Sequence, residues 1–231
     1  MLSILYSDAA LLAVDKPPGQ LVIPGRGAPE PTVLDAARAE HGELWVVHRL
    51  DRGTSGVLLF ARSAEAHRAL NVAFDSRRVK KRYLAVVAGS PPEEQRIEVP
   101  IAAARRGRMR PARPGDGKAK PAATYVRVLE RFAGPPALAL VECVPETGRT
   151  HQLRVHLMAA QTPLAFDPDY GPRPPLVFAD GTPLIARTPL HAASLAFDHP
   201  MSGVPLRVEA PLPDDMGALL ERARGEPLRE A

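Results

Sequence analysis

A polar nonapeptide between two apolar runs, His48–Gly56 with the sequence HRLDRGTSG, constrains this chain more than any other feature. Residues 45–47 lead into it as one predicted strand, and residues 56–61 lead out of it as another. A loop between two core strands presents reactive groups from a rigid scaffold. Arg49 and Asp51 are two positions apart, so in an extended segment they point to the same side. Asp51 is therefore a candidate catalytic carboxylate, although an Arg-x-Asp triplet alone also fits a surface ion pair beside a turn.

Short apolar runs separated by turn residues predict the other elements of an α+β fold. Residues 2–6 and 11–15 form a predicted hairpin. Thr32 and Ser63 are predicted N-caps of two helices, and the first helix is expected to run to about Glu40. Further predicted elements are strands at 83–87, 124–129, 137–144 and 206–208, and helices from about Thr150 and over 214–224. Strands dominate without strict alternation with helices, which favours a largely antiparallel sheet.

Glycine, proline and clustered charge predict the irregular segments. Gly25-Arg26-Gly27 is a predicted loop, and Gly134-Pro135-Pro136 is a predicted turn between two strands. Residues 103–121 are predicted to form an irregular basic insertion. Residues 168–189, rich in Pro and Gly, are predicted to be mostly loop.

Composition sets broad limits on the kind of protein. The 231 residues suit one large domain or two small ones, and we expect a single domain over residues 1–231. A formal net charge of +4 modestly favours an anionic partner. Cys143 is the only cysteine, so no intrachain disulfide is possible, as expected in a reducing cytoplasm. Neither a signal peptide nor a membrane-spanning apolar segment is recognisable, so we expect a cytoplasmic protein with no membrane partner.

Other distinctive segments accompany the nonapeptide in a fixed order. They are Ile4–Tyr6, Val14–Gly19 (VDKPPG), Lys80–Ala85 (KKRYLA), Glu146–Leu157 (ETGRTHQLRVHL), Leu190–Ala192 (LHA) and Phe197–Pro200 (FDHP). Together with HRLDRGTSG, this set resembles the RluA-like family of RNA pseudouridine synthases over roughly residues 3–212. One segment departs from the family pattern Gly-Asp-x-x-Tyr-Gly, because Phe166 stands where the first glycine is usual. We expect a different loop shape there, with an effect on substrate preference rather than on catalysis.

The resemblance implies a mixed, mostly antiparallel, bent central sheet with flanking helices and an active-site cleft. It implies an isomerase that converts specific uridines of ribosomal or transfer RNA to pseudouridine, with Asp51 as the catalytic residue. It assigns the cation beside Asp51 to Arg154 and the active-site tyrosine to Tyr83. Leu153 would supply an apolar wall of the substrate pocket, although an ordinary core position fits it equally well. Because these motifs begin close to Met1, we expect the small N-terminal RNA-binding domain of many relatives to be absent.

Basic residues near the predicted site are candidates for contacts with structured RNA through its phosphates. The resemblance places Arg49 where it could fill the space left by a flipped-out nucleotide. The predicted RNA-binding residues are Arg49, Arg52, Lys80, Lys81, Arg82, Arg105, Arg106, Arg108, Arg149 and His151. These residues belong mostly to two basic runs, residues 77–82 and 105–120, which taken alone also fit a solvated face and a surface loop.

Pseudouridine formation breaks a nitrogen–carbon glycosidic bond, turns the uracil and rejoins it through carbon 5. It involves no redox change, so we expect no cofactor, but it needs the exclusion of water. His151 and His156 are five positions apart, unlike the paired histidines of His-Glu-x-x-His sites, and Cys143 has no companion, so we expect no metal. The carboxylate could attack the anomeric carbon, attack carbon 6 of the base or remove a ribose proton, and the sequence leaves all three open.

Two other functions are compatible with parts of the pattern. The basic runs fit a non-catalytic RNA-binding or RNA-folding protein on the same fold. A hydrolase that releases free uracil would also use an aspartate. The presence of Asp51, Tyr83 and Arg154 in matching segments favours the synthase, which we expect to act as a monomer.

Overall fold

The computed structural model describes residues 1–25, 30–134, 136–226 and 228–230. The chain divides into two compact units. Unit 1 comprises Met1–Lys81 with His191–Pro211, and unit 2 comprises Arg82–Leu190 with Leu212–Ala231. The predicted loop at Arg26 and Gly27 and the predicted turn at Pro135 lie outside the described residues.

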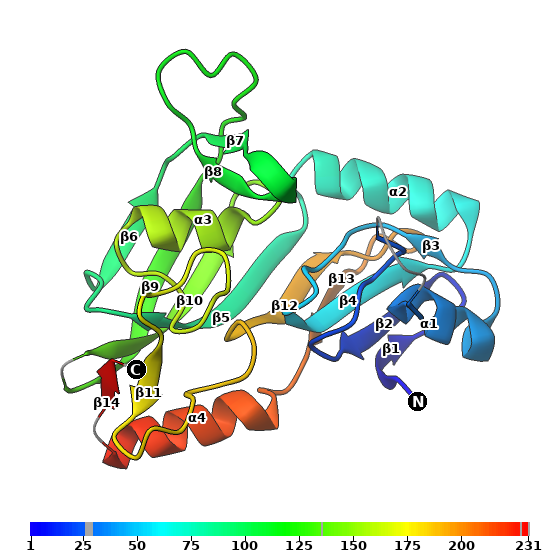
Figure 1. The fold of residues 1–231 in the computed structure, drawn as a ribbon. Helices are drawn as coiled ribbons and strands as arrows, with labels where there is room; N and C mark the ends of the chain where they lie inside the picture. The colour runs from blue at the N-terminus through cyan, green and yellow to red at the C-terminus, as the bar shows by residue number, and fades with distance from the viewer. Residues whose placement is uncertain (26–29, 135, 227, 231) are drawn as a thin grey trace. The chain divides into compact units, whose positions relative to one another are not determined.

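Unit 1 is built on a sheet whose centre is the fully buried strand β4 (Ser55–Ala61). The sheet runs in the order β1 (Ser3–Ser7), β2 (Leu11–Lys16), β4 and β12 (Leu190–Asp198), with β13 (Pro205–Glu209) beside β12. The short strand β3 (Trp45–Val46) also pairs with β4. These pairings are antiparallel except that of β4 with β12, which is parallel at Ser55 and Gly56. Figure 1 shows these strands in blue, cyan and orange.

Both helices of unit 1 begin at the predicted caps. The Thr32 hydroxyl accepts a hydrogen bond from the amide of Asp35, whose carboxylate returns the contact, and this capping box starts α1 (Val33–His41). The Ser63 hydroxyl caps α2 (Ala64–Asp75) by accepting a hydrogen bond from the amide of Ala66. The buried stripe of α2 packs on β2, β4 and the β12–β13 pair, which is the apolar cluster of this unit.

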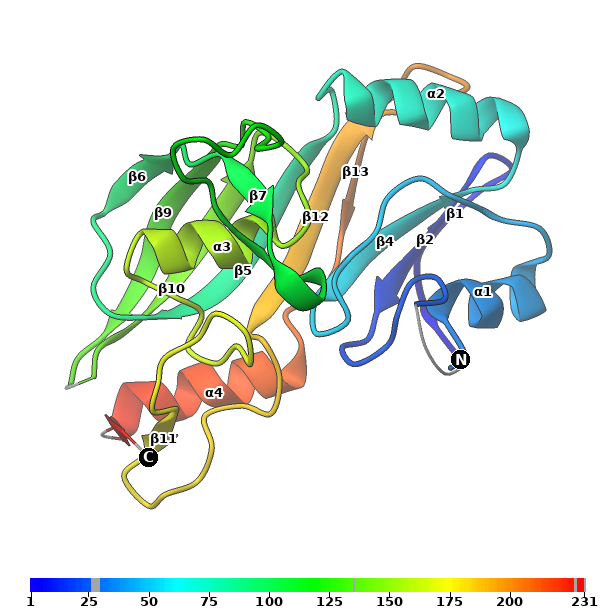
Figure 2. The ribbon, with the colours of Figure 1, turned by 45° about the horizontal axis from the view of Figure 1, so that its top comes forward.

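Unit 2 contains an antiparallel sheet in the order β5 (Lys80–Ala88), β10 (Leu138–Pro145), β9 (Thr124–Phe132) and β6 (Glu94–Ile97). Alternate residues of β5 enter two different apolar clusters. Val86 packs with α4 (Asp214–Gly225), whereas its neighbours Ala85 and Val87 pack with α3 (Gln152–Ala159). Since successive strand residues face opposite sides, the two helices cover opposite faces of this sheet, as Figure 2 shows.

Two predicted irregular segments contain more structure than expected. The basic insertion folds back as a hairpin of β7 (Ile101–Ala103) and β8 (Met109–Pro111), with one 3-10 turn (Arg105–Gly107) between them. Residues 112–119 contain no strand or helix, as predicted, whereas β8 was missed because it is only three residues long and carries little apolar alternation. The Pro-rich segment is mostly loop but contains β11 (Leu176–Phe178), which pairs with β14 (Leu228–Glu230).

The α+β class and the mostly antiparallel pairing are confirmed. The final helix begins at Asp214 as predicted. The edge strand β6 was missed because three of its four residues are polar. The description as one domain remains a prediction.

Gly56 is a sharp test of the parallel pairing in unit 1. Its φ is +109°, and a Cβ atom there would lie 2.2 Å from the carbonyl oxygen of Ala192 on β12. We expect Gly56→Ala to lower the free energy of unfolding by roughly 3 kcal/mol, measured by urea denaturation. Gly42→Ala is the matched control, because Gly42 also has a positive φ (+77°) but a Cβ atom there would meet nothing within 4 Å. Equal losses in the two variants would contradict the close approach of β4 and β12.

Candidate active site

Asp51 lies on the connection between β3 and β4 in unit 1. The Thr54 amide donates to the Asp51 carbonyl at 3.0 Å, which closes a turn at the start of β4. In the segment before this turn, Leu50 is buried, Arg49 is exposed and Asp51 is half-buried. The contrast between exposed Arg49 and buried Leu50 follows the alternation expected of an extended segment, and Asp51 is partly accessible to solvent.

The backbone of this connection is fixed by Lys16, the last residue of β2. Lys16 is fully buried, and its ammonium donates to the carbonyls of Pro17 at 2.7 Å, Arg52 at 3.2 Å and Thr54 at 2.8 Å. An ammonium has three protons, and three carbonyl acceptors match them. Two more hydrogen bonds join the same segments, from the Gly19 amide to the Arg52 carbonyl and from Arg52 Nε to the Gly19 carbonyl, both 2.8 Å. The loop that carries Asp51 is therefore held against residues 17–19 by side-chain and backbone contacts together.

His48 completes the support of this connection. Its Nε2 accepts from the amide of Leu59 at 3.0 Å, just beyond the point where β3 stops pairing with β4. Its ring stacks on Phe74 of α2 with the centroids 5.0 Å apart. Burial lowers the pKa of His48 to about 3, and repulsion by Lys81 adds to the effect. His48 is thus a neutral structural residue, with the proton on Nδ1 as its hydrogen bond requires.

His191 and His199, the histidines of the LHA and FDHP segments, form hydrogen bonds within unit 1. His191 is fully buried, with Nδ1 3.0 Å from the Ser55 hydroxyl and Nε2 3.4 Å from the Ala210 carbonyl. His199 lies 2.9 Å from the carboxylate of Asp8. Ser55 therefore shapes the beginning of β4 through a buried hydrogen bond.

Tyr83 lies on β5, opposite Cys143 of β10, and is half-buried. The adjacent predicted RNA-binding residues differ in their surroundings. Lys80 is exposed, whereas burial and the neighbouring Arg77 lower the pKa of Lys81. Arg82 forms an ion pair with Glu142. The basic run therefore divides into side chains that face solvent and side chains engaged within the protein.

Arg154 is held by a network within unit 2. It is buried, and its Nε and Nη2 form a bidentate pair with the fully buried carboxylate of Asp167 at 2.7 and 2.8 Å. Its Nη2 also lies 3.2 Å from Asp169, and its guanidinium lies 4.9 Å from the centre of the Tyr170 ring. These contacts fix the plane of the guanidinium, since bidentate pairing constrains orientation as well as distance.

The helix that carries Arg154 is anchored by two other polar residues of the same motif. Gln152 donates to the Ala123 carbonyl at 2.9 Å and to the Thr124 hydroxyl at 3.0 Å. His156, one turn further along α3, lies 2.9 Å from the same hydroxyl and 2.9 Å from the Val99 carbonyl. Burial lowers the pKa of His156, so this histidine too is neutral. Leu153 packs in the apolar cluster on this face of the sheet, which is the ordinary core position that the sequence also allowed.

The remaining predicted RNA-binding residues lie at the hairpin and before α3. Arg105 and Arg106 are exposed at the turn between β7 and β8, and Arg108 pairs with Asp169 at 3.3 Å. Arg149 lies on the loop before α3 and donates to the Pro121 carbonyl at 3.1 Å. His151 starts α3 with a φ of +53° and lies 2.9 Å from the Tyr170 hydroxyl.

The predicted catalytic residues belong to both units. Asp51 is in unit 1, whereas Tyr83 and Arg154 are in unit 2, so the pairing of Asp51 with Arg154 stays a prediction. In the described part of the chain, no three His, Cys, Asp or Glu side chains gather as a metal site requires. None of the described helices combines the length and apolar character that a membrane crossing requires.

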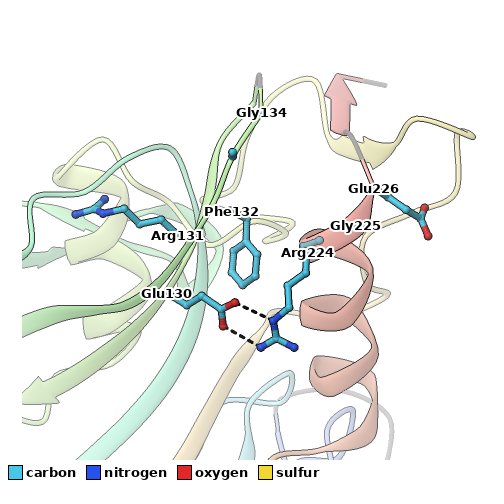
Figure 3. Close-up of a pocket in the computed structure, with 9 residues that line it drawn as sticks. Glu130, Arg131, Phe132, Gly134, Arg224, Gly225 and Glu226 are labelled. Carbon is cyan, nitrogen blue, oxygen red and sulfur yellow. Dashed lines mark hydrogen bonds and ion pairs between the residues drawn. The ribbon is translucent and has the colours of Figure 1, made fainter.

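None of these residues lines the pocket found in unit 2. It is bounded by Glu130–Gly134 of the β9–β10 hairpin and by Ala223–Glu226 at the end of α4. In Figure 3, Arg224 pairs with both oxygens of Glu130, each at 2.8 Å. Because this ion pair satisfies the charges of both side chains and no predicted site residue lines the pocket, we do not assign the candidate site there.

Sequence reasoning missed several residues that position the site. Lys16 belongs to the VDKPPG segment, but nothing in the sequence distinguishes a buried lysine from an exposed one at a strand end. The segment that departs from the family pattern also contains Asp167, Asp169 and Tyr170. Its two carboxylates, 13 and 15 positions after Arg154, were the only sequence feature that could have indicated partners for this arginine. Phe166, the departing residue, packs against the apolar cluster that includes α4.

Comparison with known proteins gives a consistent result. A model of the RNA pseudouridylate synthase family matches residues 10–159, more than half of the chain. The ribosomal large subunit pseudouridine synthase D of Xanthomonas campestris pv. campestris is 39% identical over 242 residues, covering 100% of this chain and 72% of that protein. The protein of the same name from Nitrosomonas europaea is 42% identical over 233 residues, covering 98% of this chain and 66% of that protein. The chain thus spans about two thirds of the length of these relatives.

Solved structures show the same similarity in three dimensions. Human RNA Pseudouridylate Synthase Domain Containing 4 matches with a TM-score of 0.78 and 27% identity, over 98% of this chain and 94% of that one. Human RNA Pseudouridylate Synthase Domain Containing 1 matches with a TM-score of 0.75 and 26% identity, over 100% and 97% of the two chains.

The pKa of His48 makes stability depend on pH. The pKa is 6.5 for an unperturbed histidine and about 3 here, so the unfolded chain binds the proton first as the pH falls below 6.5. The stability that neutral His48 contributes is complete above pH 6.5 and is lost between there and pH 3. We expect His48→Gln, which keeps an acceptor for Leu59, to flatten the loss between pH 7 and pH 5 by about 2 kcal/mol in urea titrations. Parallel pH profiles in the two proteins would contradict this role.

The buried ammonium of Lys16 is open to a direct stability test. Lys16→Met keeps the length of the side chain but removes three hydrogen bonds to backbone carbonyls, so we expect a loss of roughly 3 kcal/mol in unfolding free energy. Lys80→Met on the exposed start of β5 is the control and should change stability by less than about 0.5 kcal/mol. A Lys16→Met protein as stable as the control would show that the Asp51 loop does not depend on this residue.

Proposed function

The chain belongs to the RNA pseudouridylate synthase family, and from this premise we propose that it isomerises uridine in large-subunit ribosomal RNA, with Asp51 as its catalytic residue. The single observation that carries the assignment of the residue is the position of half-buried Asp51 on a loop fixed by Lys16. Both named relatives are pseudouridine synthases of the large ribosomal subunit, which supports this RNA over transfer RNA.

The reaction sets clear demands on the carboxylate. It must be ionised to act as a nucleophile at the anomeric carbon or at carbon 6, or as a base toward a ribose proton. It must also stay in place while the base detaches and turns. A loop held by a buried ammonium and by paired backbone hydrogen bonds meets the second demand, because little entropy remains to be lost when the substrate binds.

Arg154 and Tyr83 complete the proposed active site. A cation beside a carboxylate favours its ionised form, which is the role we propose for Arg154 toward Asp51. The bidentate contact with Asp167 supports this role, because it presents the guanidinium in one orientation. The half-buried Tyr83 has an aromatic face to stack on uracil and a hydroxyl that can exchange a proton at carbon 5.

Exposed basic residues supply the proposed contacts with structured RNA. Arg49, Lys80, Arg105 and Arg106 are exposed, and each can approach a phosphate without breaking a buried contact. We propose Arg49 as the side chain that enters the space of the flipped nucleotide. Arg52 and Arg82 pair with Glu30 and Glu142, so RNA contacts by these residues would replace existing ion pairs.

The chemistry itself calls for no cofactor or metal, because the bonds broken and formed balance without redox change. We propose a monomeric cytoplasmic enzyme, and the single buried Cys143 is compatible with that compartment.

The catalytic assignment is tested by Asp51→Asn, which removes the charge and keeps the size of the side chain. We expect the rate of pseudouridine formation to fall by roughly a thousandfold or more. The assay follows the loss of tritium from carbon 5 in [5-³H]uridine-labelled large-subunit ribosomal RNA made by transcription. Asp75→Asn at the exposed end of α2 is the control and should keep the wild-type rate.

The outcomes separate the candidate functions. Wild-type activity in Asp51→Asn would refute the catalytic assignment. Binding of this RNA by the wild-type protein without any tritium release would favour the non-catalytic RNA-binding function. Release of free uracil would indicate the hydrolase.

A further inference from the structure

The segment that follows Asp167 forms a tight, internally bonded turn. The Asp167 carboxylate accepts from the amides of Asp169 at 2.9 Å and Tyr170 at 3.2 Å, and the Gly171 amide donates to the Asp167 carbonyl at 2.9 Å. A Cβ atom at Gly171 would lie 2.6 Å from the Asp167 amide nitrogen, so only glycine closes the turn this way. The positions of Asp169 and Tyr170 are therefore fixed relative to Asp167, which holds Arg154.

Asp169 contacts arginines from two different elements. One carboxylate oxygen lies 3.3 Å from Nε of Arg108, at the end of the turn between β7 and β8. The other oxygen lies 3.2 Å from Nη2 of Arg154 on α3. The Arg108 side chain is 44% exposed and that of Asp169 is 31% exposed, whereas the Arg154 side chain is 9% exposed. The contact thus links a solvent-facing arginine to a buried one through a single carboxylate.

Tyr170 makes a second connection between the same two elements. Its hydroxyl accepts from the amide of Met109 at 2.8 Å, and Met109 is the residue after Arg108. The same hydroxyl lies 2.9 Å from Nδ1 of His151, at the start of α3. Its ring lies against the guanidinium of Arg154 at 4.9 Å, within the range of a cation–π contact. Tyr170 is buried, so these contacts are sheltered from water.

The two connections join what we call the hairpin tip, Arg105–Met109, to Arg154. The tip carries exposed arginines that suit phosphate contacts, and Arg154 is the proposed partner of the catalytic carboxylate. We propose that Asp169 and Tyr170 are positioning residues, which keep Arg154 in register with RNA bound at the hairpin tip. The proposal rests on the proposed function, because it takes Arg154 to be part of the active site and the tip to contact RNA.

The proposal predicts that RNA affinity and the rate of pseudouridine formation respond differently to changes at Arg105 and Arg108. A phosphate contact at Arg105 adds only affinity, because Arg105 is not among the contacts of Asp169. A change at Arg108 affects both affinity and the placement of Arg154, although Arg108 itself has no described contact with Arg154. If Asp169 only stabilised the fold, Asp169→Asn would lower activity, but substitutions of Arg108 and Arg105 would have equal effects on the rate.

The test compares Arg108→Ala with its matched control, Arg105→Ala, in the full chain. Affinity is measured by filter binding and the rate by single-turnover tritium release at saturating enzyme, both with transcribed large-subunit ribosomal RNA. We expect both variants to weaken binding by about fivefold. Only Arg108→Ala should also lower the single-turnover rate, by about tenfold. The double variant Arg108→Ala/Asp169→Asn should be no slower than Asp169→Asn alone, since the two side chains act through one contact.

A second measurement does not depend on catalysis. The exchange rate of the Arg154 Nε proton, followed by NMR, reports how firmly the guanidinium is held. We expect it to rise in Asp169→Asn, in Tyr170→Phe and in Arg108→Ala, and to stay unchanged in Arg105→Ala. An unchanged Arg154 signal in Arg108→Ala, or equal single-turnover rates for Arg108→Ala and Arg105→Ala, would overturn the proposal.

Failure of this proposal and failure of the proposed function give different results. If Asp51→Asn were as active as wild type, the catalytic assignment would fail, and the NMR comparison would still decide whether the hairpin tip positions Arg154. If Asp51→Asn were inactive while both arginine variants kept the wild-type rate, only the positioning role would fail.

Discussion

The buried ammonium of Lys16 is the interaction on which the geometry of the candidate site depends. It ends β2, donates to the carbonyls of Pro17, Arg52 and Thr54, and has no exposed surface. A lysine in this position is costly unless every proton finds an acceptor, and the three carbonyls provide that compensation. Without the ammonium, the carbonyls of Pro17 and Thr54 would lose this donor, and the Arg52 carbonyl would keep only its hydrogen bond from the Gly19 amide. The charge therefore stabilises one backbone conformation of the loop, which places Asp51 just before β4, the most buried strand of unit 1.

A second buried charge organises unit 2 in a similar way. Arg154 and Asp167 satisfy each other through two parallel hydrogen bonds, and the turn that follows Asp167 adds Asp169 and Tyr170 around the guanidinium. The polar residues of α3 divide their tasks by face. Gln152 and His156 meet at the Thr124 hydroxyl and anchor the helix, while Arg154 turns toward the acidic segment. Each unit thus contains a charged side chain whose orientation is set by hydrogen bonds within that unit.

Local features of the sequence predicted local structure well. Thr32 and Ser63 start helices because a hydroxyl beside free amide groups needs no distant partner, and the alternation around Asp51 is a property of extended backbone. The ordered motifs predicted the family and placed Asp51, Tyr83 and Arg154 in recognisable segments.

What the sequence did not reveal depends on partners far apart in the chain. Lys16 is 38 positions from Thr54, and its burial is a property of the folded sheet. Nothing in the sequence distinguished the arginines around the hairpin from one another. In the structure Arg110 pairs with Asp116 while Arg105 faces solvent, and only the fold of the hairpin separates them. A single sequence shows residue types and their spacing, but it does not show which distant group pairs with a given charged side chain.

The most direct test of the account is a map of pseudouridine in ribosomal and transfer RNA from cells with and without this gene. The account predicts that one or a few positions of the large-subunit ribosomal RNA lose pseudouridine when the gene is absent. Those positions should regain it with the wild-type gene but not with one encoding Asp51→Asn. An unchanged map, or full restoration by the Asp51→Asn gene, would contradict it.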